Sequence, residues 1–266
     1  MSNYWSKRIA KAQDRLTSKN TKKVEKQLTK YYVSAMESVI KEFEATYDKL
    51  KATMEAGKEP VPADLYKLDK YWKLQGQMRH ELEKLGNRQA VLMSKAFETN
   101  YFEVYYSFAL PGKEPYTTLD TAAAKQMINS IWCADGKSWS SRIWGNIQRL
   151  QDALNDKLIE CVVSGKKTTE LKRILQEQFG ASYSRADTLV RTEMAHIQTE
   201  AAKKRYQDYG LEEYEILGNE DDSCGQKGVN CHELHGKKFK YSEMRAGVNA
   251  PPFHPNCKCS IIPVIK

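Results

Sequence analysis

Apolar residues recur at steps of three and four along most of the first 100 residues, which is the spacing of one face of an α-helix. One stripe runs through residues 24–54 and a second through residues 65–97. The segment 57–62 between them contains two prolines, which interrupt a helix. The sequence therefore predicts two long helices that pack as an antiparallel hairpin. Such a hairpin has little core of its own and needs a third helix or another protein as a partner.

Further helices are predicted between residues 138 and 210. Apolar positions from Ile143 to Val162 lie on one face of a helix that begins at Ser138. Glycine commonly ends a helix, so Gly165, Gly180 and Gly210 divide this region into three predicted helices. Before them, the aromatic segment 99–118 is expected to be a strand or an irregular arm, and Asp120 or Thr121 is expected to cap a short helix.

The pattern changes after residue 210. Weak alternation at 213–217 and short apolar runs at 238–241 and 260–265 predict three strands. The predicted fold is mainly α: a long N-terminal helical hairpin and a helical unit, followed by a small α+β domain with loops rich in cysteine and histidine. The corresponding division of the chain is 1–134, 135–210 and 211–266.

The composition is that of a globular protein, because 41% of the 266 residues are hydrophobic and 29% are charged. No apolar run approaches the roughly 20 residues that cross a bilayer. The N-terminal residues lack the apolar region of a signal peptide, so we expect synthesis and retention in the cytosol, with no membrane partner. Thiols stay reduced there, which favours metal binding over disulfides.

The net charge of +8 is unevenly distributed. Residues 181–266 contain 12 basic and 12 acidic side chains, so the whole excess lies in residues 1–180. A cluster of bases near the N-terminus is a candidate contact for nucleic acid or for an acidic protein surface, while a solvated helix face is the equally weighted alternative. Its members are Lys7, Arg8, Lys11, Arg15, Lys19, Lys22 and Lys23.

Thiols and imidazoles are concentrated in the last 43 residues. Zinc takes four such ligands in tetrahedral geometry, so this concentration predicts a zinc site, with two disulfides or buried reduced thiols as alternatives. The candidate ligands are Cys224, Cys231, His254, Cys257 and Cys259. His232 and His235 are additional candidates, and His235 is more typical of a solvated loop histidine. Cys133 and Cys161 lie in helical context and are expected to be ordinary buried residues.

Two patterns invite a catalytic interpretation. His232, His254 and Asn256 are residue types that a metal-dependent HNH-like nuclease uses, and the acidic segment 220–222 could hold a hard cation. The paired strand histidines of such nucleases are missing, so we expect no enzyme. Arg191 and Glu193 point to different sides of a helix and are expected to be polar anchors that tie this helix to the sheet.

Several separated motifs occur together in one order. They are the run 186–193 (ADTLVRTE), the run 221–224 (DDSC), the turn 231–236 (CHELHG), Phe239, and the tail 251–259 (PPFHPNCKC). With this set, residues 135–266 resemble the phage Mu F-like minor head protein family of tailed bacteriophages.

The resemblance implies a structural protein of the virion that lies inside the capsid near the portal. It implies partners among the portal and other head proteins, several copies per portal, and roles in head assembly, DNA packaging and genome ejection. Contact between the basic cluster and phage DNA would then be independent of sequence. Some relatives carry an enzyme domain after the tail, but only seven residues follow Cys259, so we expect none here.

Overall fold

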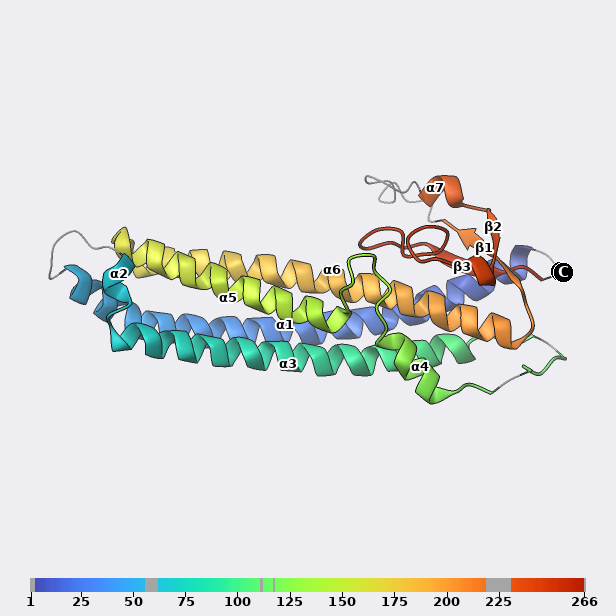
Figure 1. Cartoon of the computed structure of the whole chain (residues 1–266), viewed down its shortest axis with the longest axis horizontal. Coiled ribbons are helices and arrows are strands. Elements are labelled where there is room, and N and C mark those ends of the chain that lie inside the picture. Colours follow the sequence, from blue (N-terminus) through green and yellow to red (C-terminus); the bar gives the residue numbers. More distant parts are fainter. Residues whose placement is uncertain (1–2, 56–61, 111, 117, 219–230, 266) are drawn as a thin grey trace. The chain divides into compact units, whose positions relative to one another are not determined.

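The computed structural model of the chain describes residues 3–55, 62–110, 112–116, 118–218 and 231–265. Its long helices are α1 (Asn3–Glu55), α3 (Asp69–Tyr106), α5 (Trp139–Val163) and α6 (Thr168–Asp208) (Figure 1). Its short helices are α2 (Pro62–Leu65), α4 (Thr121–Ile128), α7 (Cys231–Leu234) and the 3-10 helix η1 (Tyr241–Glu243). Its strands are β1 (Glu213–Leu217), β2 (Lys238–Lys240) and β3 (Ser260–Pro263). The predicted fold class, mainly α with a small C-terminal sheet, is confirmed.

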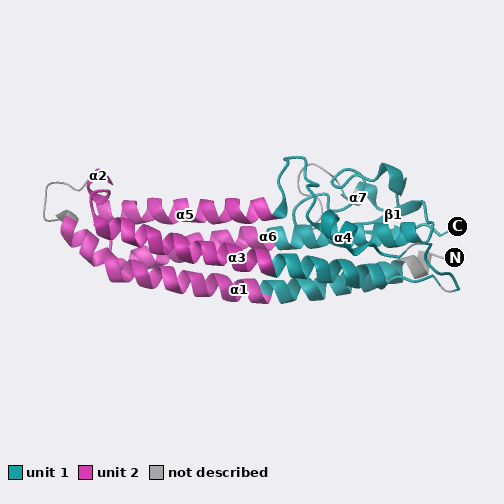
Figure 2. Ribbon diagram, turned by 60° about the horizontal axis from the view of Figure 1, so that its bottom comes forward, with its two compact units in different colours: residues 1–25, 92–139, 188–266 teal, residues 26–91, 140–187 magenta. Residues whose placement is uncertain are grey.

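The chain forms two compact units, each built from separated segments (Figure 2). Unit 1 comprises residues 1–25, 92–139 and 188–266, and unit 2 comprises residues 26–91 and 140–187. The division into 1–134, 135–210 and 211–266 stays a prediction. In the described part of the chain, no helix combines the length and the apolar character that crossing a membrane requires.

The first two long helices are antiparallel, as predicted. In unit 1, Asn20 of α1 donates to Asn100 of α3 at 3.2 Å. In unit 2, the guanidinium of Arg88 lies 5.7 Å from the ring centre of Tyr31. The residue number on α3 decreases as the residue number on α1 increases, so the two helices run antiparallel.

The third helical partner of this hairpin is α6. Within unit 1 it contacts α1 through Gln198 and Asp14. Within unit 2 it contacts α1 through Tyr183 and Thr29, whose hydroxyls lie 2.9 Å apart. Asn146 of α5 joins the same unit 2 core, donating to the carbonyl of Ser182 at 2.9 Å.

Two helix boundaries differ from the prediction. Gly165 and Gly210 adopt positive φ at helix ends, but Gly180 lies inside the continuous helix α6. A glycine in a helix interior costs only about 1 kcal/mol, and the apolar stripe continues beyond it through Ala186 and Val190, so packing overrides the local signal. Similarly, α3 continues to Tyr106, so the first part of the aromatic segment is helical rather than a strand or arm.

The predicted cap at Asp120 is confirmed, because its carboxylate accepts from the backbone N–H groups of Ala122 and Ala123. The apolar stripe predicted through residues 65–97 includes Trp72 as a core position, which is wrong, because its side chain is 56% exposed. Its neighbour Tyr71 is buried instead, so the apolar face of α3 is displaced by one residue at this point.

The C-terminal sheet has the strand order β2-β1-β3, with both pairs antiparallel. Contacts between aromatic side chains join it to α6. The ring of Tyr214 in β1 stacks on the ring of Tyr241 with 5.1 Å between ring centres, and the ring centre of Tyr241 lies 6.5 Å from that of Tyr206 in α6. Tyr206 in turn meets Phe108 edge to face at 4.8 Å. The aromatic segment is therefore the core that connects the end of α3 to α6 and the sheet within unit 1.

Candidate functional site

The seven bases of the N-terminal cluster lie on one exposed face of α1. Each of their side chains is exposed. At 100° per residue they fall within an arc of about 160°. The buried residues of the same segment lie on the opposite side of the helix, among them Ala10, Gln13, Thr17 and Val24. Residues 7–23 of α1 therefore present a continuous basic face about 24 Å long.

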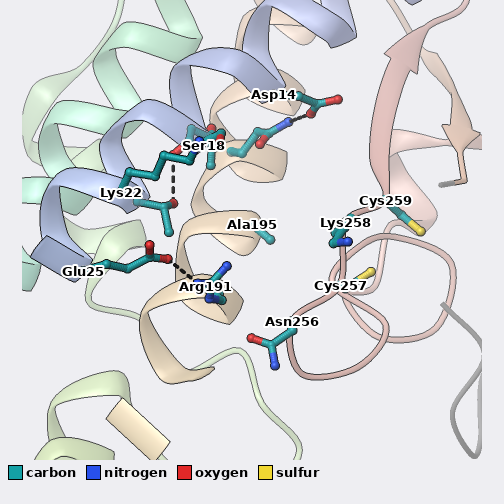
Figure 3. A pocket seen from close by; sticks show the side chains of 13 residues that line it. Asp14, Ser18, Lys22, Glu25, Arg191, Ala195, Asn256, Cys257, Lys258 and Cys259 are labelled. Carbon is teal, nitrogen blue, oxygen red and sulfur yellow. Dashed lines mark hydrogen bonds and ion pairs between the residues drawn. The ribbon is translucent and has the colours of Figure 1, made fainter. Parts of the chain in front are cut away.

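Asp14 lies in this segment and Glu25 follows it, and both acids contact α6. The side-chain amide of Gln198 donates to Asp14 Oδ1 at 2.5 Å. Arg191 Nη2 lies 2.8 Å from Glu25 Oε1 (Figure 3). Because both carboxylates lie at the edge of the arc, they do not interrupt the basic face.

The carboxyl of Asp14 is difficult to ionise. Burial raises its pKa from 3.8 to about 6, and the hydrogen bond from Gln198 lowers it only in part. Between about pH 4 and pH 6 the folded protein therefore holds a proton that the unfolded chain has released. Stability contributed by this group is present at low pH and is lost as the pH rises through about 6.

The substitution Asp14→Asn is expected to stabilise the protein by about 1–3 kcal/mol at pH 7, because two pKa units correspond to about 2.7 kcal/mol. The asparagine oxygen can still accept from Gln198. The gain should vanish near pH 4, which thermal unfolding from pH 4 to pH 8 would measure. Asp152→Asn, an exposed change, is the control. Equal stabilisation of both variants, or none in Asp14→Asn, would contradict the assignment.

Three consecutive residues of α6 bind three different segments of unit 1. Arg191 pairs with Glu25 of α1, and Glu193 accepts from Trp132 Nε1 at 2.9 Å. Between them, the hydroxyl of Thr192 accepts from the backbone N–H of Asn256 at 3.1 Å. Successive helix positions are 100° apart, so one turn reaches three directions. Thr192, which no sequence motif singled out, is the residue of the three that joins α6 to the C-terminal tail.

Asn256 shapes the tail loop through its backbone. Its φ is +59°, a left-handed conformation that asparagine tolerates better than most residues. The turn precedes Cys257, Lys258 and Cys259, so it sets how they leave the loop. This is a structural role for a residue that the nuclease interpretation had treated as catalytic.

Two of the predicted metal ligands lie together. Cys231 Sγ is 3.3 Å from His254 Nε2, close to the roughly 3.6 Å expected between a sulfur and a nitrogen on one tetrahedral zinc ion. The other ring nitrogen, Nδ1, is 2.8 Å from the carbonyl oxygen of Pro255. A carbonyl can only accept, so Nδ1 carries the proton and donates. Nε2 of the neutral ring then keeps its lone pair for a metal or a thiol, the arrangement typical of metal-ligating histidines.

Cys257 and Cys259 form a second pair. A hydrogen bond from the Cys259 thiol is the main cause that lowers the pKa of Cys257 to about 6, and backbone hydrogen bonds from Phe253 and Cys259 add to it against the effect of burial. Across the described residues, no three His, Cys, Asp or Glu side chains converge as a ligand set. The five cysteines within the described ranges form no disulfide with one another. Cys224 lies outside the described residues, so its assignment stays a prediction.

The remaining candidates are His235, an additional metal candidate, and the nuclease candidates His232, His254 and the acidic segment 220–222. His235 Nδ1 accepts from the backbone N–H of Gly218 at 3.0 Å, which closes the loop between β1 and β2. The acidic segment 220–222 and the side chain of His232 lie outside the described part. His254 has both ring nitrogens engaged in the contacts above. The observed contacts of these histidines therefore serve the local structure of the tail.

A comparison with protein families identifies the C-terminal part of the chain. Residues 152–262 match the family described as phage Mu protein F like protein. This segment is similar to the Mu F-like family. No curated protein and no solved structure matches the chain.

The Mu F-like segment contains the elements that carry the site. It includes the C-terminal half of α5, all of α6 and the residues from β1 through the tail. The turn at Arg191–Glu193 and the Cys and His pairs therefore lie within the family region, while the basic face of α1 precedes it. The match supports a role in the phage head. It also indicates localisation in the virion and interaction with other head proteins.

Proposed function

We propose that this protein is a minor head protein of a tailed bacteriophage that lies inside the capsid at the portal. In this role it binds the portal in several copies during head assembly and takes part in DNA packaging and ejection. The observation that carries the proposal is the Mu F-like match over residues 152–262. The turn Arg191–Glu193 and the tail, which the match covers, account for the compact structure of unit 1.

The basic face of α1 supplies the contact to packed DNA. Lysine and arginine side chains bind phosphates without reading bases, and their contribution falls steeply with salt. The face is exposed and carries no ionised carboxylate among residues 7–23 except Asp14, which is directed toward α6. DNA contact of this kind is independent of sequence, as a protein that holds an entire genome requires.

Zinc is proposed as the element that stabilises the tail. Cys231 and His254 fit one edge of a tetrahedral site. Cys257 and Cys259, which do not converge with this pair among the described residues, would move toward it to complete the ligand set. The ion would supply a cross-link between α7 and the tail, in place of a large apolar core. Cys224 is the alternative fourth thiolate.

Portal association is tested by expressing the full chain together with the portal protein of the phage that encodes it. Co-elution with the portal ring, at more than one copy per ring, is the expected result. Elution of the chain by itself, under conditions in which the portal ring is intact, would overturn the proposed location. Deletion of residues 231–266 serves as a second arm, because it removes the tail and leaves the helices.

A nuclease assay separates this proposal from the catalytic alternative. Incubation of plasmid DNA with the protein and Mg²⁺, Mn²⁺ or Zn²⁺ is expected to give no cleavage. Cleavage that is lost in both His232→Ala and His254→Ala would establish a nuclease instead. Cleavage that persists in both variants would be assigned to a contaminant, and would leave the structural role in place.

A further inference from the structure

A pocket of about 640 Å³ in unit 1 lies between residues 14–25 of α1, residues 191–198 of α6 and the tail loop 256–259 (Figure 3). Its volume falls in the range of sites that hold a small molecule such as a nucleotide. Three segments that are far apart in the sequence meet here, and the contact between Thr192 and Asn256 holds the tail loop against α6.

Hydroxyl groups from two turns of α1 line the pocket. They belong to Thr17, Ser18 and Thr21. Thr17 is only 8% exposed, and within the described residues its hydroxyl has no hydrogen-bond partner. Buried hydroxyls in proteins are nearly always satisfied, so this one is available to a molecule in the pocket that offers an acceptor or a donor. The hydroxyl of Thr21 donates to the carbonyl of Thr17 at 2.8 Å and remains able to accept.

Positive charge exceeds negative charge around the same space. Lys22 comes from α1, Arg191 from α6 and Lys258 from the tail loop. The two acids are Glu25, which is held by Arg191, and Asp14, which accepts from Gln198. Lys22 and Lys258 thus face the pocket from different segments, as Figure 3 shows.

We infer that this pocket binds a phosphate group, held by the Lys22 and Lys258 ammonium groups and by the Thr17 hydroxyl. Lysine binds phosphate as a mobile point charge, and a hydroxyl adds a directed donor to a phosphate oxygen. Arg191 is kept in place by Glu25 and adds charge at the wall. The phosphate can belong to a DNA backbone, to a nucleotide or to inorganic phosphate, because the three share the same chemistry.

The site is tested on the full chain by calorimetric titration with three probes: sodium phosphate, thymidine monophosphate and a 20-base-pair DNA duplex. Sodium chloride at equal ionic strength is the reference. Thr17→Val removes the hydroxyl at nearly constant shape, and Lys258→Gln removes one charge. Lys240→Gln, an exposed change on β2 that does not line the pocket, is the matched control.

The expected result is that Thr17→Val and Lys258→Gln each weaken binding of at least one probe by about fivefold or more, while Lys240→Gln leaves it within twofold. The probe affected assigns the source of the phosphate. The inference would be overturned if the wild type shows no binding of any of the three probes above the sodium chloride reference. It would also be overturned if the wild type and both pocket variants bind the probes with equal affinity. Circular dichroism of each variant checks that the fold is intact. The result does not depend on portal binding, so the two proposals fail separately.

Discussion

DNA binding is expected to weaken by about 100-fold at low salt when five bases of the α1 face are all changed to glutamine in one variant. The slope of log affinity against log salt should fall by about four. The five residues are Lys11, Arg15, Lys19, Lys22 and Lys23. Each exposed base of the α1 face is taken to neutralise about one phosphate. Fluorescence anisotropy with labelled duplexes, at salt concentrations from 50 to 300 mM, measures both quantities. Two duplexes of unrelated sequence should give the same result, because contacts to phosphate do not distinguish bases.

The matched control removes the same charge from exposed positions in unit 2. These positions are Lys41, Lys49, Lys70, Lys73 and Arg79. If both five-residue variants lose affinity equally, net charge rather than the α1 face determines DNA binding. If the α1 variant retains both the affinity and the salt slope of the wild type, this face does not contact DNA, and an acidic protein surface becomes the better partner.

Metal removal is the second change with a large expected effect. Protein purified without added zinc is expected to contain about one equivalent, because structural zinc sites bind with apparent energies on the order of 10 kcal/mol. A strong chelator, or the double change Cys257→Ser and Cys259→Ser, should then lower Tm by on the order of 10 °C. Elemental analysis and calorimetry measure the two effects.

Cys133→Ser is the control for this experiment, since Cys133 lies outside the tail and should leave both metal content and Tm unchanged. Less than about 0.2 equivalents of zinc would reject the metal site, given the affinity expected for such sites. Thiol titration in denaturant, without reductant, then distinguishes the remaining alternatives. Six reactive thiols would indicate reduced cysteines, and two would indicate two disulfides.

The sequence predicts the long elements well, because they have a strong local signal. The stripe through Ile143 and Val162 gives α5, and a proline-containing link separates α1 from α3. It predicts less well where a local preference competes with packing. Gly180 costs α6 little, and the aromatic residues before Tyr106 are compatible with either helix or strand until α6 provides their partners.

The site is harder to predict, because its parts meet only in three dimensions. The spacing of cysteines and histidines indicates a cluster, and the structure places Cys231 beside His254, 23 residues later in the chain. Nothing in the pattern near Thr17 or Lys258 indicates that they line one pocket. Asp14 carries a weak signal: on a helical wheel it lies at the border of the basic arc, next to the buried side.

The pairing of α1 with α6 determines when the N-terminal segment can complete its contacts during synthesis. Gln13 and Asp14 bind Tyr206 and Gln198, which lie 193 and 184 residues later in the chain. At ribosomal rates of about 5–20 residues per second, these partners emerge roughly 10–40 seconds after the N-terminus. During that interval Gln13 and Asp14 lack these two partners, although α3 is already available to α1. A nascent-chain experiment should therefore find this segment protease-sensitive until residues beyond 206 have left the ribosome.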